Sequence, residues 1–154
     1  MPSSTDRLEK QIVIDAPRTR VWRAITDVQE FNEWFGVRLT SPFAPGAEVS
    51  GQITIPGYTH VTMTAWVETV EPEHRFSFRW HPNAIDPKVD YSGEPTTLVT
   101  FTLEEVSGGT RLTVTESGFD AIPEWRRVPA FQGNSEGWAS QLENVRKHVA
   151  GVTR

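Results

Sequence analysis

Cysteine is absent from the 154 residues of the chain. Its absence excludes disulfide bonds, thiol nucleophiles and thiolate metal ligands. The four histidines, His60, His74, His81 and His148, do not supply a substitute, because no two of them stand at the spacing of a helical metal site. We therefore expect these histidines on the surface or in loops, and we expect no metal ion and no other cofactor.

Long hydrophobic runs are also absent. Residues 1–10 are polar and charged, without the apolar segment of a secretory signal peptide. No apolar run approaches the roughly 20 residues that span a bilayer. The sequence therefore predicts no stable membrane insertion and a cytoplasmic location. The chain length fits the usual size of one domain, so residues 1–154 are expected to form a single domain.

An excess of positive charge is missing as well. The formal net charge is −5, and the basic residues are mixed with acidic ones along the chain. Proteins that bind nucleic acid usually present a basic face to the phosphates. The chain also lacks the glycine-rich patterns that cradle phosphate groups after a strand. These absences predict that nucleic acid is not a partner.

Two short helices are predicted after a first strand at residues 7–15. Pro17 stops the strand and suits the first position of a helix, and apolar residues then recur at helical spacing. Asp27, with Glu30 three positions later, has the pattern of a helix cap. A second short helix is therefore expected to begin after Asp27 and to end at Gly36.

Alternating strands dominate the middle of the chain. In residues 75–81, Phe76, Phe78 and Trp80 alternate with polar side chains, which is typical of a strand with one buried face. The same alternation predicts strands at residues 48–55, 58–70, 96–106 and 110–117. Proline and glycine predict loops at residues 39–47 and 82–95.

A long helix is predicted over residues 135–149, where Trp138 and Leu142 belong to one apolar stripe. Residues 120–132 stay ambiguous between a loop and a short helix broken at Pro129. No crossover helix separates the strands, so the sheet is antiparallel and needs a cover on its apolar face. The predicted fold is α+β, with a curved antiparallel sheet of about six strands wrapped around the long C-terminal helix.

Large apolar side chains on the inward faces of these elements are candidates for a ligand cavity between sheet and helix. Such residues either fill a core or line a pocket, and the sequence leaves both alternatives open. The candidates are Trp34, Phe35, Met63, Phe76, Phe78, Trp80, Phe101, Trp138 and Leu142.

Glu116 is the charged candidate for this cavity. It continues the strand parity of Leu112 and Val114, so its side chain is expected to point inward. Burial without a charged partner raises the pKa of a carboxyl group. Glu116 is therefore a candidate for orienting a ligand or for acid and base chemistry; the alternative is a partly solvated residue at a strand end.

Residues 133–137 match the GxSxG pattern of a hydrolase nucleophile elbow. That chemistry needs a buried strand before the serine, and the preceding residues do not form one. We therefore interpret Ser135 as the N-terminal cap of the long helix.

The order of elements resembles the helix-grip fold of the START-like (SRPBCC) superfamily. Within it, the chain resembles the branch similar to the C-terminal domain of the activator of the heat-shock-protein-90 ATPase. The stretches that carry the resemblance are Ile14–Asp27, Trp34, Val67–Trp80, Thr96–Phe119 and Glu136–Val149. The resemblance implies a cavity between sheet and helix; many members bind apolar or amphipathic small molecules, and some are enzymes.

Three functional hypotheses follow. The first is a non-catalytic domain that binds an apolar, aromatic or lipid-like molecule, with loops 39–47, 82–95 and 120–132 around the entrance. The second is a cavity enzyme of cyclase, hydratase or hydrolase type, with Glu116 as acid or base and Tyr58 or Tyr91 as a helper. The third is a co-chaperone-like or homodimeric interaction module that uses an exposed Trp66 on the outer sheet face.

Overall fold

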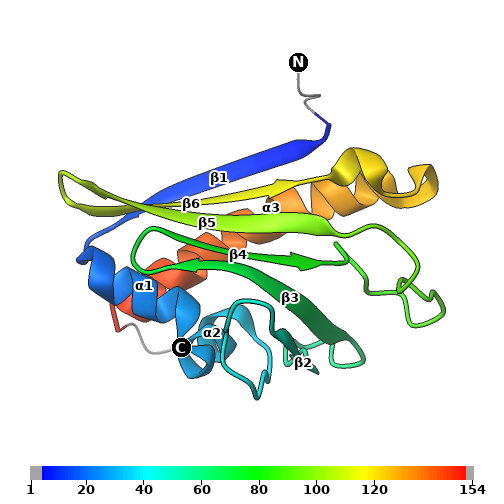
Figure 1. Cartoon of the computed structure of the whole chain (residues 1–154), viewed down its shortest axis with the longest axis horizontal. Helices are drawn as coiled ribbons and strands as arrows, with labels where there is room; N and C mark the ends of the chain where they lie inside the picture. The colour runs from blue at the N-terminus through cyan, green and yellow to red at the C-terminus, as the bar shows by residue number, and fades with distance from the viewer. Residues whose placement is uncertain (1–4, 152–154) are drawn as a thin grey trace.

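The computed structural model describes residues 5–151 and confirms the predicted α+β fold (Figure 1). A six-stranded sheet curves around one long helix, and two short helices follow the first strand. The elements in chain order are β1 Arg7–Ile14, α1 Arg18–Thr26, α2 Val28–Phe35, β2 Glu48–Gln52, β3 Thr62–Glu71, β4 Arg75–Trp80, β5 Thr97–Val106, β6 Gly109–Ser117, the 3-10 turn η1 Phe119–Ala121 and α3 Glu124–Val149.

All neighbouring strands of the sheet are antiparallel, in the order β1-β6-β5-β4-β3-β2. β1 lies beside β6, so that Arg7 pairs with Ser117 and Ile14 with Thr110. Gly109 allows this close approach, because a Cβ atom there would lie 2.1 Å from the backbone oxygen of Ile14. The sheet thus joins the beginning of the described chain to its last strand.

The short helices form as the sequence predicts. The Asp27 carboxylate accepts hydrogen bonds from the backbone N–H groups of Gln29 and Glu30, at 3.0 and 3.1 Å, and caps α2. Gly36 ends the helix with a φ of 90°, a left-handed conformation that glycine adopts without strain. These signals set where α2 begins and ends. Figure 1 shows α2 beside the end of α3 that lies opposite the β4–β5 loop.

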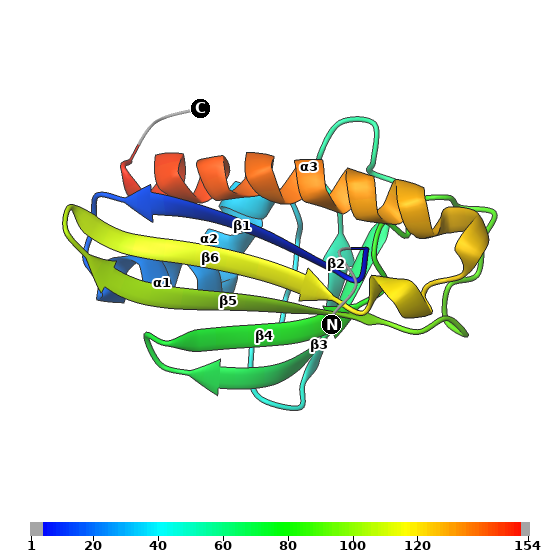
Figure 2. The same cartoon turned by 90° about the horizontal axis from the view of Figure 1, so that it is seen from above.

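The long helix begins earlier than the sequence predicts. α3 runs unbroken from Glu124 to Val149 and contains Pro129, so Ser135 lies inside the helix and the prediction of a cap at Ser135 is wrong. Proline removes one backbone hydrogen bond and disfavours a helix interior. Packing outweighs this cost, because Ala130 is fully buried and the ring of Phe131 lies edge-on to that of Phe119, with centroids 5.1 Å apart. Figure 2 shows α3 extending along the length of the sheet.

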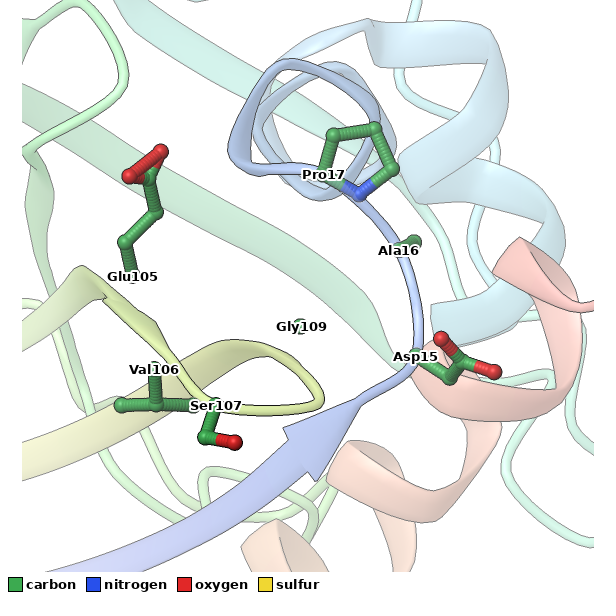
Figure 3. A pocket seen from close by; sticks show the side chains of 7 residues that line it. All are labelled: Asp15, Ala16, Pro17, Glu105, Val106, Ser107 and Gly109. Atoms are coloured by element: carbon green, nitrogen blue, oxygen red, sulfur yellow. The ribbon is translucent and has the colours of Figure 1, made fainter.

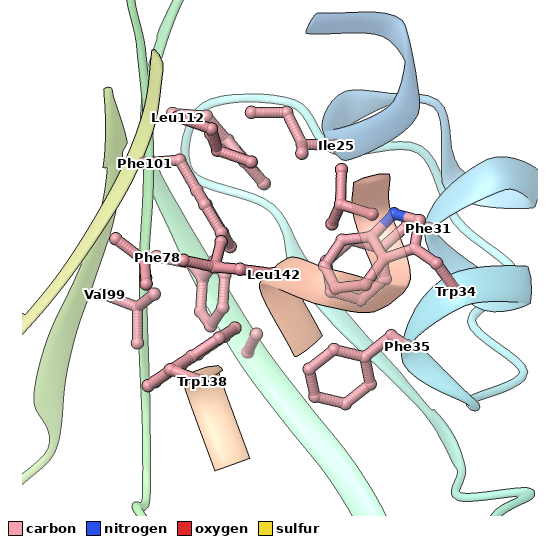
Figure 4. Packing of buried hydrophobic residues seen from close by; sticks show 14 of the residues in the cluster. Ile25, Phe31, Trp34, Phe35, Phe78, Val99, Phe101, Leu112, Trp138 and Leu142 are labelled. Carbon is pink, nitrogen blue, oxygen red and sulfur yellow. The ribbon is translucent and has the colours of Figure 1, made fainter. Parts of the chain in front are cut away.

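The core lies between α2, α3 and the concave face of the sheet (Figure 4). Phe31 stacks on Phe35 within α2, with ring centroids 5.0 Å apart. The indole of Trp138 on α3 lies edge-on to Phe101 of β5 at 5.5 Å. Within residues 5–151, no helix has the length and apolar character needed to cross a membrane.

Candidate ligand pocket and the buried Glu116 network

A pocket of about 660 Å³ opens between the β2–β3 region, the loop after β4 and the middle of α3. Apolar side chains make up much of its wall. They are Phe35, Ile53, Ile55, Val61, Met63, Trp80, Ala84 and Ile85. A mostly apolar concave wall with few polar groups is typical of small-molecule sites.

The polar members of the wall come from three elements. Asn134, Glu136 and Ser140 line the pocket from α3, and Tyr91 lines it from the β4–β5 loop. His81 also lines it, and its Nε2 atom lies 3.1 Å from the backbone oxygen of Glu94. Thr62 and Thr64 line it from β3. Polar groups therefore lie on the helix side and on the sheet side of the pocket.

Behind this wall, Glu116 is completely buried and has four hydrogen-bond donors. Its Oε2 atom accepts from the Trp80 indole at 2.8 Å and from the Thr97 hydroxyl at 2.5 Å. Its Oε1 atom accepts from the Trp138 indole at 2.8 Å. The Asn134 amide lies 3.0 and 3.1 Å from the two oxygens. We call these five side chains the Glu116 network.

The electrostatics of the network follow from burial and from the kind of donor. Burial raises the pKa of Glu116 above its ordinary value of 4.5, because desolvation disfavours the charged form. The hydrogen bonds from Thr97, Trp80, Trp138 and Asn134 oppose this rise without cancelling it. Within the described part of the chain, no ion pair involves Glu116, so neutral dipoles alone stabilise its charge.

The structure divides the predicted cavity residues into two groups. Phe35, Met63 and Trp80 line the pocket, and Trp138 lines a smaller adjoining cavity of about 150 Å³ that shares Phe35, Trp80 and Asn134 with it. The remaining apolar candidates do not reach either cavity and lie in the core, several of them visible in Figure 4. They are Trp34, Phe76, Phe78, Phe101 and Leu142.

Glu116 does not line the pocket. Tyr58 and Tyr91, the two predicted helpers, do not donate a hydrogen bond to Glu116. Tyr58 and Tyr91 do line the pocket. The Tyr91 hydroxyl accepts a hydrogen bond from the backbone N–H of Asp86 at 3.2 Å. Of the three loops predicted around the entrance, residues 82–95 alone contribute to the pocket wall.

Asn134 and Thr97 are members of the network that the sequence analysis missed. The sequence contains a signal for Asn134, which stands four positions before Trp138 and therefore lies on the same helix face. This signal holds only if the helix already includes residue 134, as it does because α3 continues through Pro129. The prediction that the helix starts at Ser135 concealed that relation. Thr97 gave no comparable signal, since a threonine in a strand is ordinary.

An arginine from the start of α3 holds the pocket loop. The Arg126 guanidinium donates to Glu94 Oε1 at 2.7 Å and to the backbone oxygen of Pro82 at 2.7 Å. It also lies over the Tyr91 ring, 4.6 Å from the centroid. Since Arg126 and Glu94 are both largely buried, this ion pair anchors both ends of the loop to α3.

The histidines do not all fit the prediction of surface or loop positions. His148 is only 9% exposed at its side chain, and its Nε2 atom lies 2.8 Å from Glu30 Oε1. Its position in the last turn of α3 brings it against α2, which the sequence pattern did not reveal. Among residues 5–151, no group of three or more His, Cys, Asp or Glu side chains has a geometry that could hold a metal ion.

Trp66 lies on the outward parity of β3, as predicted, between the buried Ala65 and Val67, but its side chain is only partly exposed. The indole donates to Glu48 Oε1 at 2.9 Å, and its ring lies edge-on to His81, with centroids 5.6 Å apart. The strongly exposed tryptophan is Trp125 in the first turn of α3, at 66%. The interaction module built on Trp66 stays a prediction.

A second depression of about 660 Å³ lies where the β1–α1 turn meets the β5–β6 hairpin. Figure 3 shows the carboxylates of Asp15 and Glu105 on opposite sides of it. Ala16, Pro17, Val106, Ser107 and Gly109 complete its wall. Convergent polar groups, which a ligand site requires, are not found among these wall residues.

The curved sheet, the long helix and the pocket between them define a protein of the helix-grip class. Residues 15–150 match the family described as activator of Hsp90 ATPase homolog 1-like protein. The chain therefore belongs to this family. A comparison with curated proteins found no match.

Solved structures of similar fold come from several bacteria. Protein MLL2253 of Mesorhizobium loti is 25% identical, with a TM-score of 0.74 over 96% of this chain and 99% of that one. Protein Ms6760 of Mycobacterium smegmatis is 22% identical, with a TM-score of 0.71 over 97% and 91%. DynU16, described as a putative protein in the dynemicin biosynthetic locus, is 24% identical, with a TM-score of 0.74 over 97% of this chain but 48% of its own. These likenesses support the fold.

Proposed function

We propose that the chain is a binding domain for a small aromatic or amphipathic molecule, held in the pocket between the sheet and α3. The observation that carries the proposal is the pocket itself. Its volume of about 660 Å³ falls within the range usual for small-molecule sites. Phe35, Met63 and Trp80 offer the apolar and aromatic surface that such a ligand needs.

The placement of Glu116 favours binding over catalysis. A general acid or base must come within hydrogen-bond reach of the proton that it transfers. Both Glu116 oxygens are already occupied by side chains that stand between it and the pocket, Trp80 and Asn134 among them. We infer that Glu116 orients the pocket wall and does not react with the ligand.

The function is tested by filling the pocket from α3. Gly137 lines both cavities, and a Cβ atom there would meet no heavy atom within 4 Å, so Gly137→Leu places a side chain in the pocket without backbone strain. Replacing a glycine inside a helix also stabilises the helix by about 1 kcal/mol. We expect native mass spectrometry and thermal-shift screens of aromatic metabolites and lipids to find ligands for the natural chain, and the variant to lose them while its Tm rises.

The matched control is Ala139→Leu, an equal side chain two positions away on α3 at an exposed site outside the pocket wall. It should retain the ligands. Equal binding by the natural chain and by Gly137→Leu would place the ligand elsewhere. The absence of any binder in either screen would count against the binding function itself.

A further inference from the structure

We propose that the pocket selects neutral or cationic ligands that carry a hydrogen-bond donor and discriminates against carboxylates, because Glu116 fixes the orientation of the Asn134 amide. This inference rests on the proposed binding function and names the ligand class of the same pocket. Three features of the site support it, one from the network, one from Asn134 itself and one from the charges of the pocket wall.

The first feature is the donor inventory around Glu116. An ionised carboxylate only accepts hydrogen bonds, and an indole N–H only donates. The indoles of Trp80 and Trp138 are consistent with the ionised form of Glu116. The amide of Asn134, which bridges both carboxylate oxygens at 3.0 and 3.1 Å, must then turn its Nδ2 atom toward Glu116. The reverse orientation would set the amide oxygen against the carboxylate.

The second feature is the free end of the same amide. With Nδ2 committed to Glu116, the Oδ1 atom of Asn134 points away from the carboxylate, and among residues 5–151 no donor is hydrogen-bonded to it. Asn134 lines both the main pocket and the adjoining cavity. The amide oxygen is therefore an acceptor available to a ligand, and a ligand N–H or O–H is its complement.

The third feature is the sign of the charges. Within the described chain, the pocket wall contains Glu136 but no lysine or arginine. The nearby Arg126 lies over Tyr91 and is paired with Glu94 at 2.6 Å, so its charge is already neutralised. Glu116 adds negative charge behind the wall when ionised. Among the described wall residues, His81 is the one basic side chain, and its Nε2 atom is already directed at the backbone oxygen of Glu94. A ligand carboxylate would therefore meet repulsion without a lysine or arginine of the wall to offset it.

Four probes that share one ring system separate donor recognition from charge. They are 2-naphthalenemethanol, 2-naphthylmethylamine, 2-methylnaphthalene and 2-naphthoate, measured by titration calorimetry or by quenching of tryptophan fluorescence at pH 7.5. We expect the alcohol and the amine to bind at least about tenfold more tightly than the carboxylate. We expect 2-methylnaphthalene, which has no donor, to bind about three- to tenfold more weakly than the alcohol.

Two variants assign the effects to residues. Asn134→Leu keeps the size of the side chain and removes the acceptor, so the preference for the alcohol over 2-methylnaphthalene should disappear. Glu136→Gln removes a charge from the wall without touching the Glu116 network and should improve 2-naphthoate binding about two- to threefold. Glu143→Gln on the same helix, outside the wall, should change none of the four affinities.

The outcomes separate the inference from the function on which it rests. Equal affinity for all four probes would overturn the selectivity and leave the binding function intact. A preference for the alcohol that persists in Asn134→Leu would also overturn it. If none of the probes binds while the screens find other ligands, the ligand class is wrong; if no compound binds at all, the binding function fails with it.

Discussion

Two buried or half-buried glutamates, one beside the middle of α3 and one beside its last turn, receive hydrogen bonds from that helix and differ in the charge of their donors. Glu116 is contacted by Asn134 and Trp138 of α3 near the pocket. Glu30 is contacted by His148 in the last turn of α3, at 2.8 Å. The donors of Glu116 are all neutral, whereas those of Glu30 include two arginines.

The difference shifts the two pKa values in opposite directions. Burial acts on both carboxyl groups and by itself raises the pKa of each. At Glu30 the hydrogen bonds from His148 and Arg20, with the charges of Arg20 and Arg23, overcome burial and lower the pKa. At Glu116 neutral donors do not suffice, and the pKa stays raised. Cationic donors therefore favour the ionised form of a half-buried carboxyl group, while neutral donors alone leave a buried one easier to protonate than in the unfolded chain.

Removing each carboxylate should produce the largest difference in the free energy of unfolding between the two sites. Glu116→Ala leaves two indoles, an amide and a hydroxyl without an acceptor in a buried site, and we expect a loss of more than about 3 kcal/mol in the free energy of unfolding. Glu30→Ala, at a partly exposed site, should cost about 1–2 kcal/mol. Urea unfolding followed by circular dichroism measures both values.

Val13→Ala, at an exposed site on β1, is a control that should change the free energy of unfolding by less than about 0.5 kcal/mol. Similar losses for the two glutamate variants would contradict the distinction between the sites. The four donors of the Glu116 network would then have to find other hydrogen-bond acceptors in the variant.

The pH dependence of stability should separate the two glutamates next. A raised pKa in the folded state means that folding takes up a proton, so the Glu116 contribution is full below the ordinary value of 4.5 and is lost as pH rises through the folded-state pKa. A lowered pKa has the opposite sign, so the Glu30 contribution is present above 4.5 and is lost as pH falls. Unfolding measured between about pH 3.5 and 8 for the natural chain, Glu116→Gln and Glu30→Gln tests both signs.

Subtracting each variant's curve from that of the natural chain isolates its glutamate. The Glu116 difference should change on the alkaline side of 4.5 and the Glu30 difference on the acid side. Two differences that slope in the same direction would refute the opposite shifts.

Salt should give the smallest effect. Raising the salt concentration from about 0.05 to 0.5 M screens the partly exposed pairs of Glu30 with Arg20 and Arg23, so the penalty of Glu30→Gln should shrink by a few tenths of a kcal/mol. The Glu116→Gln penalty should not change, because its partners are neutral and buried. An equal response of the two penalties to salt would indicate that the Glu30 pairs are not electrostatic in origin.

Local patterns predicted the fold and the buried carboxylate well. The period-two alternation located the strands to within a few residues, except where β2 and β3 are shorter than expected, and the cap at Asp27 located α2. The inward parity of Glu116 is confirmed by its complete burial. Each of these signals is short in range, because a strand or a cap depends on residues close in the chain.

The partners of Glu116 could not be obtained in that way. Thr97 and Asn134 reach Glu116 from a different strand and from α3, so only the tertiary structure brings them together. Pro129 concealed the first turns of α3, because the local preference against proline was outweighed by packing of Ala130 and of Phe131 on Phe119. Which of the predicted apolar residues line the pocket and which fill the core also depends on where α3 crosses the sheet, and local sequence patterns do not contain that information.

The pairing of β1 with β6 has a consequence for how the chain acquires its structure. Arg7 must meet Ser117 and Ile14 must meet Thr110, partners that stand 110 and 96 positions apart in the sequence. Contacts between residues so distant in sequence slow folding, because a large loop must close before any contact compensates for its entropy. During synthesis β1 emerges long before β6. We therefore expect β1 to stay unpaired until β6 has formed, so that the first strand to be synthesised is the last to join the sheet.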